Sequence, residues 1–595
     1  MWGICLNLSI SFALIILLAI IVISFTKIAN RKRFNLNYLF LVGFFTVGFI
    51  LFLPIFSFSK DGDGLSIFQS IVLSCMNSLK LFISGCDYGD ISEIISHAPQ
   101  NITLAYQAWF LFLYIFTPVY TIGFILSFFK NVKASIQYLA NWNKDVYIFS
   151  ELNEKSFYLA KDIKTNDKKA VLVFVGFDKK EEKQNPYLFE LQAMGTILFY
   201  KNLFSINFSK HNQNRKITFF NIDYDEDKNL KDGLKIIQKY RDRNNVNLYI
   251  FSTKIDSSLL LASTNKGKIN VRRINEVQSL ISSHIYENGN ILFENAIKNN
   301  NNDKEISALI IGLGKYGTEM LKTLSWYCQM DGYNLTINAF DKDEKSLDKL
   351  KSIAPELFSE KFNGAKIDGE AEYKINVFSG VNVNENTFND IVEQIKSVSY
   401  VFVCLGDDNL NVETAISLRS LFERINSRPT IQTIVNSTLQ KNSLKDLKNY
   451  SGQCYDIDYL GDVESIYCQK VIMNSELEQK ALKQHLKWGE EAKFWEYEYN
   501  YRSSLATTMH LKAKNLCNIK GADKKTDQLT EEEKIIIEKL EHRRWNAYMR
   551  SEGYVFSGSL DEKSRNNLAK THHNLVPYNL LSKEDKKKDS DIGTI

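Results

Sequence analysis

Apolar residues are spread unevenly along this chain, and the long apolar runs lie near its start. Three runs that are almost free of charge cover residues 4–25, 39–58 and 102–129. A bilayer core is crossed by about twenty apolar residues in a helix, so each run predicts a transmembrane helix. The stretch 65–83 is only partly apolar and predicts a re-entrant or surface helix, or a weak fourth span.

Charged residues beside these runs predict the orientation of the chain. Basic residues follow the first run at 27 and 31–33, and Lys130 and Lys133 follow the third, whereas the 59–101 loop is acidic. The positive-inside rule then places the N-terminus outside and everything after about residue 130 in the cytoplasm. The first run is too long for a signal peptide. We expect a multi-pass protein of the inner (cell) membrane with a transmembrane domain at 1–135 that contacts the lipid bilayer.

After a linker at about 130–143, short apolar runs alternate with helical patterns. The runs at 145–150, 170–175 and 246–251 predict strands of a first domain at 144–298, and the alternation recurs over 305–490. Such βα alternation is typical of a doubly wound parallel sheet. Residues 495–595 carry helical patterns instead. The predicted fold class is therefore a membrane α-helical N-terminus, tandem α/β doubly wound (Rossmann) domains and a small all-α C-terminal domain.

The sequence Gly312-Leu-Gly314-Lys-Tyr-Gly317 stands between a predicted strand and a predicted helix. In a G-x-G-x-x-G turn the first glycine permits a tight turn, the second lets a phosphate approach and the third lets helix and strand pack closely. Asp341 ends the next predicted strand, where a carboxylate holds a ribose hydroxyl. The pattern predicts a nucleotide site, although the same glycines also serve a purely structural turn.

The first domain has no such turn. Its first strand is followed by Ser150-Glu-Leu-Asn, which contains no glycine, and Glu151 would repel a phosphate. We expect this domain to be structural or to bind something else. Later in it, Arg272 and Arg273 end a predicted strand, and we favour salt-bridged surface arginines over an anion site.

The glycine turn, Asp341 and the Leu-Gly-Asp407-Asp-Asn turn together resemble the RCK or TrkA-N domains that regulate potassium transport. The resemblance covers 305–435 and, more weakly, 145–290. It implies NAD or another nucleotide as ligand and a homo-oligomeric ring. The membrane part departs from that family, because Tyr88-Gly89-Asp90 lacks the preceding residues of a potassium filter. The implied cofactor-binding residues are Gly312, Gly314, Gly317, Asp341 and Asp407.

The C-terminal region resembles the Ryr domain, the small helical repeat of ryanodine receptors. The order that carries the resemblance is Glu541-His-x-x-Trp545, then Gly-Tyr554, then His572 before Leu-Val-Pro577-Tyr578. Thr530-Glu-Glu-Glu533 predicts a capping box at the start of its main helix. The alternative is that the aromatic residues form the core of the small domain. The candidate ligand-binding residues are Arg502, Arg543, Arg544, Trp545, Tyr554, His572, Pro577 and Tyr578.

Composition excludes several classes of protein. A net charge of +4 on 595 residues is too small to argue for a nucleic-acid partner, and the eight cysteines show no metal or disulfide spacing. No catalytic constellation or P-loop appears, so we expect neither an enzyme nor a metal site.

The order of the parts leads to three hypotheses. The first is a membrane effector or channel whose Rossmann and Ryr domains sense a nucleotide-derived small molecule, similar to prokaryotic TrkA-N/Ryr membrane proteins implied in antiphage defence. The second is a potassium or other cation channel, or a transport regulator, controlled by NAD(H). The third is a non-catalytic scaffold.

Overall fold

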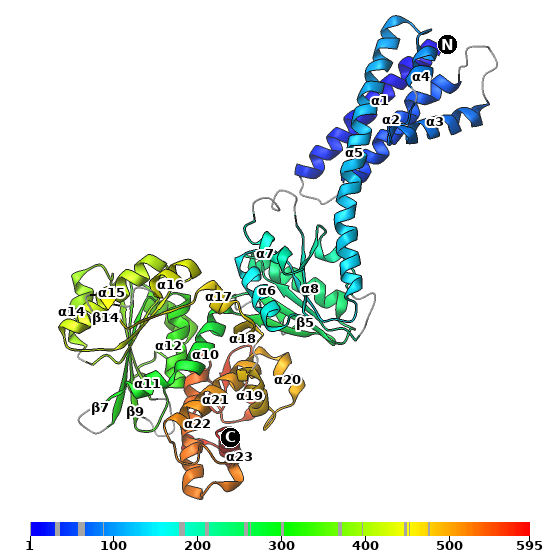
Figure 1. The fold of residues 1–595 in the computed structure, drawn as a ribbon. Coiled ribbons are helices and arrows are strands. Elements are labelled where there is room, and N and C mark those ends of the chain that lie inside the picture. The colour runs from blue at the N-terminus through cyan, green and yellow to red at the C-terminus, as the bar shows by residue number, and fades with distance from the viewer. Residues whose placement is uncertain are drawn as a thin grey trace. The chain divides into compact units, whose positions relative to one another are not determined.

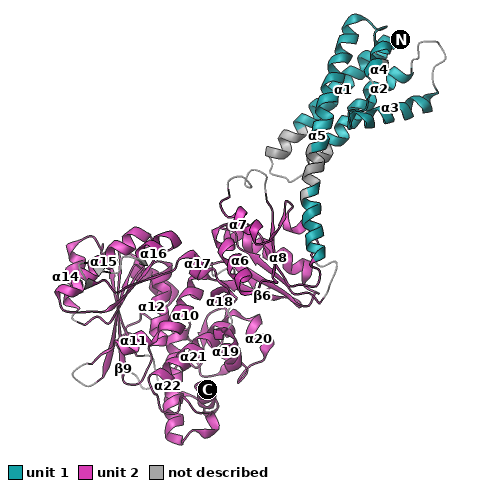
Figure 2. Cartoon of the chain, viewed as in Figure 1, with its two compact units in different colours: residues 1–140 teal, residues 141–595 magenta. Residues whose placement is uncertain are grey.

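The structure, a computed structural model, divides the chain into two compact units, residues 1–140 and 141–595 (Figure 2). The basic cluster at 31–33 and the acidic residues Asp61, Asp63 and Asp87, on which the predicted orientation depends, lie outside the described residues. The structure describes residues 2–29, 36–57, 66–86, 88–177, 185–208, 214–254, 257, 260–261, 263–298, 303–366, 372–395, 397–445, 449–450, 453–473 and 476–594.

The first unit is helical, as its apolar runs predict (Figure 1). Three of its helices, α1, α2 and α5, are long and apolar enough to cross a membrane, over Trp2–Val22, Phe40–Ser57 and Gln100–Ile122. Pro54 and Pro118 lie inside α2 and α5. The helices are α1 (Trp2–Ala29), α2 (Leu36–Ser57), α3 (Ile67–Leu81), α4 (Tyr88–Ile95) and α5 (Gln100–Ala140).

The structure narrows one prediction for this unit and corrects another. The partly apolar stretch 65–83 forms a helix, α3, as predicted, but its 15 residues are shorter than the alternative of a fourth span requires. The predicted linker at 130–143 is helical up to Ala140, because α5 continues for 41 residues. In addition, Tyr88 and Gly89 begin α4, so this segment does not have the extended backbone of a carbonyl-lined filter.

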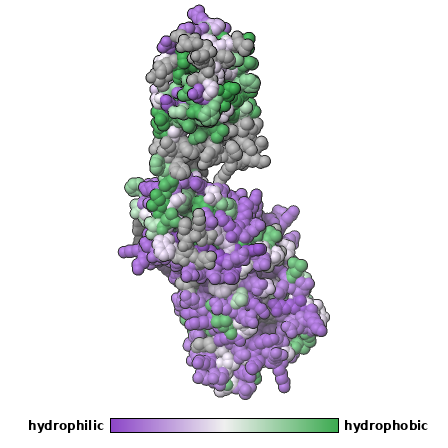
Figure 3. Space-filling view, turned by 90° about the vertical axis from the view of Figure 1, so that its right-hand side faces the viewer, coloured by the Kyte–Doolittle hydropathy of each residue, from purple (hydrophilic) through white to green (hydrophobic). Residues whose placement is uncertain are grey.

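Apolar side chains are exposed on the first unit. Only 22%, 39% and 28% of the three spans is buried within the unit. Figure 3 shows apolar residues gathered over this helical unit, whereas the visible face of residues 141–595 is mostly hydrophilic. Helices with such outward apolar faces are suited to contact lipid.

The second unit contains two sheets built on the same order of six parallel strands. The first runs in the order β3-β2-β1-β4-β5-β6, and its strands are buried along most of their length. This is the Rossmann order, with the chain reversing direction between β1 and β4. The elements are β1 (Val146–Phe149), α6 (Glu154–Asn166), β2 (Val171–Val175), α7 (Leu188–Ala193), β3 (Ile197–Phe199), β4 (Ile217–Asn221), α8 (Glu226–Tyr240), β5 (Val246–Phe251), β6 (Asn270–Ile274), α10 (Glu276–Asn288) and α11 (Asn290–Glu294).

The second sheet repeats this order as β10-β9-β8-β11-β12-β15, and a seventh strand, β7, pairs antiparallel with β8. Its helix α15 is capped by Asp407, whose side chain accepts from Leu410 N. The elements are β7 (Ile297–Lys298), β8 (Lys304–Ile311), α12 (Lys315–Tyr327), β9 (Tyr333–Asp341), α13 (Ser346–Ile353), β10 (Lys374–Ser379), α14 (Asn386–Gln394), β11 (Tyr400–Val403), α15 (Asp408–Arg424), β12 (Thr430–Ile434), α16 (Thr438–Lys445), β13 (Asn449–Tyr450), β14 (Gln453–Cys454), β15 (Ile457–Leu460), α17 (Val463–Ile466) and α18 (Gln469–Ile472).

The C-terminal part is mainly helical and packs on α12. The predicted capping box is present at the start of α22. The Thr530 side chain accepts from the backbone N–H of Glu533, and the Glu533 side chain accepts from the backbone N–H of Thr530. One core cluster joins residues of the first sheet, the second sheet and α22, such as Phe149, Ile310 and Met549. The elements are α19 (Glu476–His485), α20 (Glu491–Glu496), α21 (Glu498–Leu516), α22 (Glu531–Ser551), β16 (Val555–Phe556), β17 (Thr571–His572) and α23 (Lys583–Ile592).

Candidate nucleotide-binding site

The glycine-rich turn lies where the second sheet changes direction. Gly312 follows β8, and the turn leads into α12, while β8 has β9 on one side and β11 on the other. Ligands of doubly wound sheets bind at this switch point, outside the carboxyl ends of the strands.

Each glycine of the turn has a different environment. Gly312 has a φ of +97°, and a Cβ there would lie 2.6 Å from the carbonyl oxygen of Cys404. A Cβ on Gly317 would lie 1.8 Å from the carbonyl oxygen of Gly312, so only glycine lets α12 approach the turn this closely. A Cβ on Gly314 would meet nothing within 4 Å. The backbone at Gly314 therefore borders open space of the kind that a pyrophosphate needs.

Unpaired backbone donors face this space. The N–H groups of Gly314, Lys315, Tyr316 and Gly317 have no acceptor in the part of the chain that the structure describes. The first N–H groups of a helix lack intrahelical partners and, with the helix dipole, favour an anion. The turn combines room for a phosphate with donors for it.

Asp341 holds the turn in place. One of its carboxylate oxygens accepts from Leu313 N at 2.6 Å, and the other accepts from Asp343 N at 2.8 Å. It lies at the end of β9, beside the turn, as predicted from its position in the sequence. Each oxygen has a further lone pair that a ribose hydroxyl can use.

The opposite edge of the switch point is formed by the turn after β11. Asp407 caps α15, and Gly406 has a φ of +89° with open space around it. Asp408 accepts from the backbone N–H groups of Asn436 and Ser437 at 3.0 and 2.9 Å, which ties the end of β11 to the end of β12. Burial raises the pKa of the Cys404 thiol, which contacts the Gly312 carbonyl. By capping α15, Asp407 holds the turn after β11 in place beside the site.

The equivalent place in the first sheet holds charged side chains. Lys228 contacts Glu151 at 2.8 Å and also pairs with Asp223, which follows β4. Burial and the neighbouring Asp223 raise the pKa of Glu151 to about 7. The first sheet thus has an acidic turn, without glycine, where the second sheet has open backbone.

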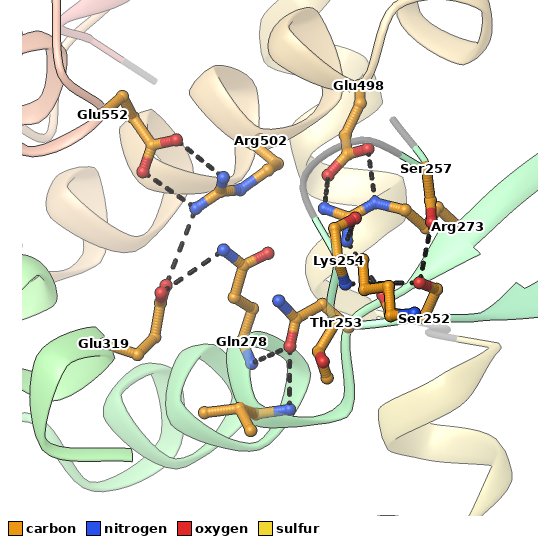
Figure 4. Close-up of polar contacts among 12 residues, drawn as sticks. Ser252, Thr253, Lys254, Ser257, Arg273, Gln278, Glu319, Glu498, Arg502 and Glu552 are labelled. Atoms are coloured by element: carbon orange, nitrogen blue, oxygen red, sulfur yellow. Dashed lines mark hydrogen bonds and ion pairs between the residues drawn. The ribbon is translucent and has the colours of Figure 1, made fainter. Parts of the chain in front are cut away.

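The three candidate arginines of the C-terminal part are directed to carboxylates in different places. Arg502 forms a bidentate pair with Glu552 at 2.7 and 3.0 Å (Figure 4). Arg543 pairs at 2.6 Å with Asp331, which lies between α12 and β9 of the second sheet's domain. Arg544 is buried and pairs with Glu541 at 2.7 Å. The structure does not bring these guanidinium groups together.

The candidate aromatic residues form two groups. Trp545 contacts His572 with ring centroids 4.8 Å apart, and burial lowers the pKa of His572 to about 3. Tyr554 is buried against Tyr499, with centroids 5.9 Å apart. Near the Trp545 group, Tyr578 is buried and its hydroxyl donates to Glu538 at 2.6 Å, and Pro577 precedes it in a half-buried turn.

Arg272 and Arg273 are salt-bridged, as predicted, but the prediction that they lie at the surface is wrong, because the pairs are buried between chain segments. Arg272 pairs with Glu478 of α19 at 2.6 Å, and Arg273 pairs with Glu498 of α21. These carboxylates lie more than two hundred residues away along the chain. They join β6 to the C-terminal helices.

Comparisons with known proteins add little to this description. No family model and no curated protein matches the chain. Among solved structures, the chain is similar to the crystal structure of a mutant of GsuK, at 13% sequence identity and a TM-score of 0.31, over 74% of this chain and 99% of that chain. The fold assignment rests on the strand order of the two sheets, and not on this similarity.

Proposed function

We propose that this chain is a ligand-gated membrane effector or channel whose second Rossmann unit binds a nucleotide, with NAD the leading candidate, at the Gly312–Gly317 turn. In this proposal residues 141–595 are cytoplasmic, the protein is a homo-oligomer, and the ligand changes the permeability of the membrane. The protein acts as a binding and switching protein, not as an enzyme. A role in antiphage defence stays a prediction from the Ryr resemblance.

One observation carries the proposal: open backbone at Gly314 lies between two glycines that the packing requires. Gly312 and Gly317 are needed for the turn and for close packing, whereas nothing in the described residues requires a glycine at 314. Space beside a helix N-terminus with unpaired N–H groups suits a pyrophosphate. The apolar helices earlier in the chain support a link to the membrane. A ligand gates only if it binds two states of the protein with different affinity.

Ion leak from proteoliposomes that contain the full-length protein tests the proposal, with NAD and NADH as probes. We expect one of them to change the leak, and Gly314→Asp to abolish both binding and response, because a carboxylate there repels a phosphate. Ser352→Asp, on the exposed face of α13, is the matched control and should leave the response intact.

Two results would contradict the proposal in different ways. Tight NAD binding with an unchanged leak would remove the gating role. A response that survives Gly314→Asp but is lost in Trp545→Ala would move the ligand site to the C-terminal part.

A further inference from the structure

The short helix α3 of the first unit lies between two helices that are long enough to cross a membrane, α2 and α5. It has 15 residues, of which only Lys80, in the last turn, is charged. At 1.5 Å per residue such a helix is about 22 Å long, whereas the hydrocarbon core of a bilayer is about 30 Å thick. A transmembrane span therefore does not explain which of its side chains point outward.

The outward face of α3 consists of large apolar side chains. Phe68 is 74% exposed and Leu79 is 59% exposed. Positions 68, 72, 76 and 79 recur at the spacing of one helix face. The exposed apolar residues of the helix are Ile67, Phe68, Ile71, Val72, Met76 and Leu79. In water this face would be unfavourable, because apolar surface is driven out of contact with water.

The inward face of α3 consists of small polar residues instead. Ser70, Ser74 and Ser78 are almost completely buried. Gly48 of α2 lies opposite them, and a Cβ at this glycine would be 3.2 Å from the hydroxyl oxygen of Ser78. Small residues allow helices to approach closely within membranes. The serine face is therefore the contact surface between α3 and α2.

The buried hydroxyl groups of this face are bonded within the protein. Ser74 donates to the carbonyl oxygen of Ser70 at 2.6 Å, and Ser78 donates to that of Ser74 at 2.7 Å. Ser70 donates to the carbonyl oxygen of Phe56 in α2 at 3.1 Å. In hydrocarbon, polar groups have to be satisfied by the protein itself, because no water is present. These three hydroxyl groups meet that requirement.

The composition of the outward face favours lipid over a second copy of this chain. Helices that pack against each other in membranes use glycine, alanine, serine and threonine at the contact, and the exposed face of α3 has none of these. The same kind of bulky apolar side chain is exposed on the three predicted spans, such as Leu14, Val42 and Leu111. Figure 3 shows apolar residues gathered over this unit. The face of α3 thus matches the surfaces that are suited to lipid.

We propose that α3 is immersed in one leaflet of the bilayer, with its outward face against lipid acyl chains and its serine face against α2. The inference rests on the proposed membrane location of the first unit. The side chain of Lys80 can extend its ammonium group toward the lipid headgroups while its methylene groups stay in the apolar layer. In this arrangement α3 holds part of the connection between α2 and α5 in the membrane.

Spin labelling of the full-length protein in phospholipid vesicles tests this. A nitroxide is attached to single cysteines in a variant without the eight native cysteines. Its collisions are measured with oxygen, which concentrates in lipid, and with a water-soluble nickel chelate. Labels at Phe68→Cys, Val72→Cys and Leu79→Cys should collide with oxygen several-fold more often than a label at Ser74→Cys, which α2 covers. We expect few collisions with the nickel chelate at all four positions.

Two reference positions calibrate the measurement. Leu14→Cys, on the exposed face of α1, is the lipid reference, and Ser352→Cys, on the exposed face of α13, is the water reference. The cysteine-free parent should unfold at the temperature of the natural protein. Three labelled positions on the outward face keep the result interpretable if one variant does not fold.

The proposal is overturned if the outward positions of α3 collide mainly with the nickel chelate, because the face would then lie in water. It is also overturned if both collision rates are low there, because protein, such as a second copy of the chain, would then cover the face. A failure confined to α3 leaves the proposed membrane location intact. If Leu14→Cys also behaves as the water reference, the proposed membrane location fails, and this inference fails with it.

Discussion

Lys315, in the glycine-rich turn of the second sheet, donates a hydrogen bond to Thr253 Oγ1 of the first sheet at 3.2 Å. Thr253 follows β5 and is itself held by Glu226, which accepts from its hydroxyl at 2.8 Å and from its N–H at 2.9 Å. The proposed phosphate-binding turn therefore touches the carboxyl edge of the neighbouring sheet. A ligand that moves this turn would change the contact between Lys315 and Thr253 directly.

The Lys315–Thr253 contact is expected to couple the two sheets weakly. Lys315→Met and Thr253→Val should each cost about 0.5–1.5 kcal/mol, and the double variant should cost less than the sum. Thermal unfolding of the four proteins of this double-mutant cycle measures the coupling. Strict additivity would show that the hydrogen bond does not stabilise the fold. Lys345→Met, on the same sheet edge but without this contact, is the control.

The three glycines of the turn are expected to respond differently to alanine. Gly317→Ala should destabilise the protein by about 1–3 kcal/mol or more, because its methyl group would overlap the Gly312 carbonyl. Gly314→Ala should cost at most ~1 kcal/mol, since its methyl enters open space and only the helix cap worsens. Melting temperatures of the two variants provide the comparison. Equal losses would mean that Gly314 is also needed for packing.

A buried ion cluster is expected to stabilise the C-terminal part. Burial alone would raise the pKa of Glu541, but Arg544 and Lys514 outweigh it and hold that pKa at about 2. Lys514 contacts Glu541 at 3.2 Å, and both side chains are buried. Removing one partner of a buried pair costs about 3–5 kcal/mol, so Glu541→Gln should destabilise by that order at neutral pH.

The pH dependence of this loss follows from the lowered pKa. The stability from ionised Glu541 is present above about pH 4.5, the ordinary value, and is lost as the pH falls through about 2. The difference in stability between the parent protein and Glu541→Gln should therefore become smaller as the pH falls. Tryptophan fluorescence during heating reports it, with the exposed Glu562→Gln as control. A stability difference that does not change with pH would contradict the prediction that ionised Glu541 stabilises the fold.

Glu151 predicts the opposite pH dependence. Burial and Asp223 raise its pKa to about 7, so the folded protein favours the protonated carboxyl. Its contribution to stability is present below about pH 4.5 and is lost as the pH rises through about 7. Glu151→Gln mimics the protonated form and should raise the melting temperature above neutral pH, with no effect in acid. Glu154→Gln, one turn away, is the control, and a destabilised Glu151→Gln at high pH would refute this.

Local patterns in the sequence predict much of the fold. The strand after residue 145, the glycine turn and the Thr530 capping box all depend on residues within a few positions of each other, and the structure confirms them. The end of α5 was predicted wrongly, because polar residues after 130 ended the apolar run but not the helix. The end of the apolar run predicts where a helix would leave a membrane. It does not predict where the helix ends, because the residues that follow can still form a helix.

The site is less predictable because its contacts are distant in sequence. Thr253 lies 62 residues from Lys315, and Glu552 lies 50 residues from Arg502, so no short motif relates them. The three glycines look the same in the sequence, and only their surroundings in the fold distinguish Gly314, which borders open space, from Gly317, which packing requires.

In the first sheet, the place that corresponds to the glycine turn is filled by the side chains of Glu151, Asp223 and Lys228. The ammonium group of Lys228 is tethered by its own side chain, so it stays beside the Glu151 and Asp223 carboxyl groups and cannot diffuse away. Among the described residues the glycine turn of the second sheet has no such ion pair, because its Lys315 contacts Thr253 of the first sheet, and the ligand proposed for this turn could therefore leave. If the proposed function is right, the charge at the first sheet stays constant, and only the occupancy of the second sheet follows the concentration of the ligand.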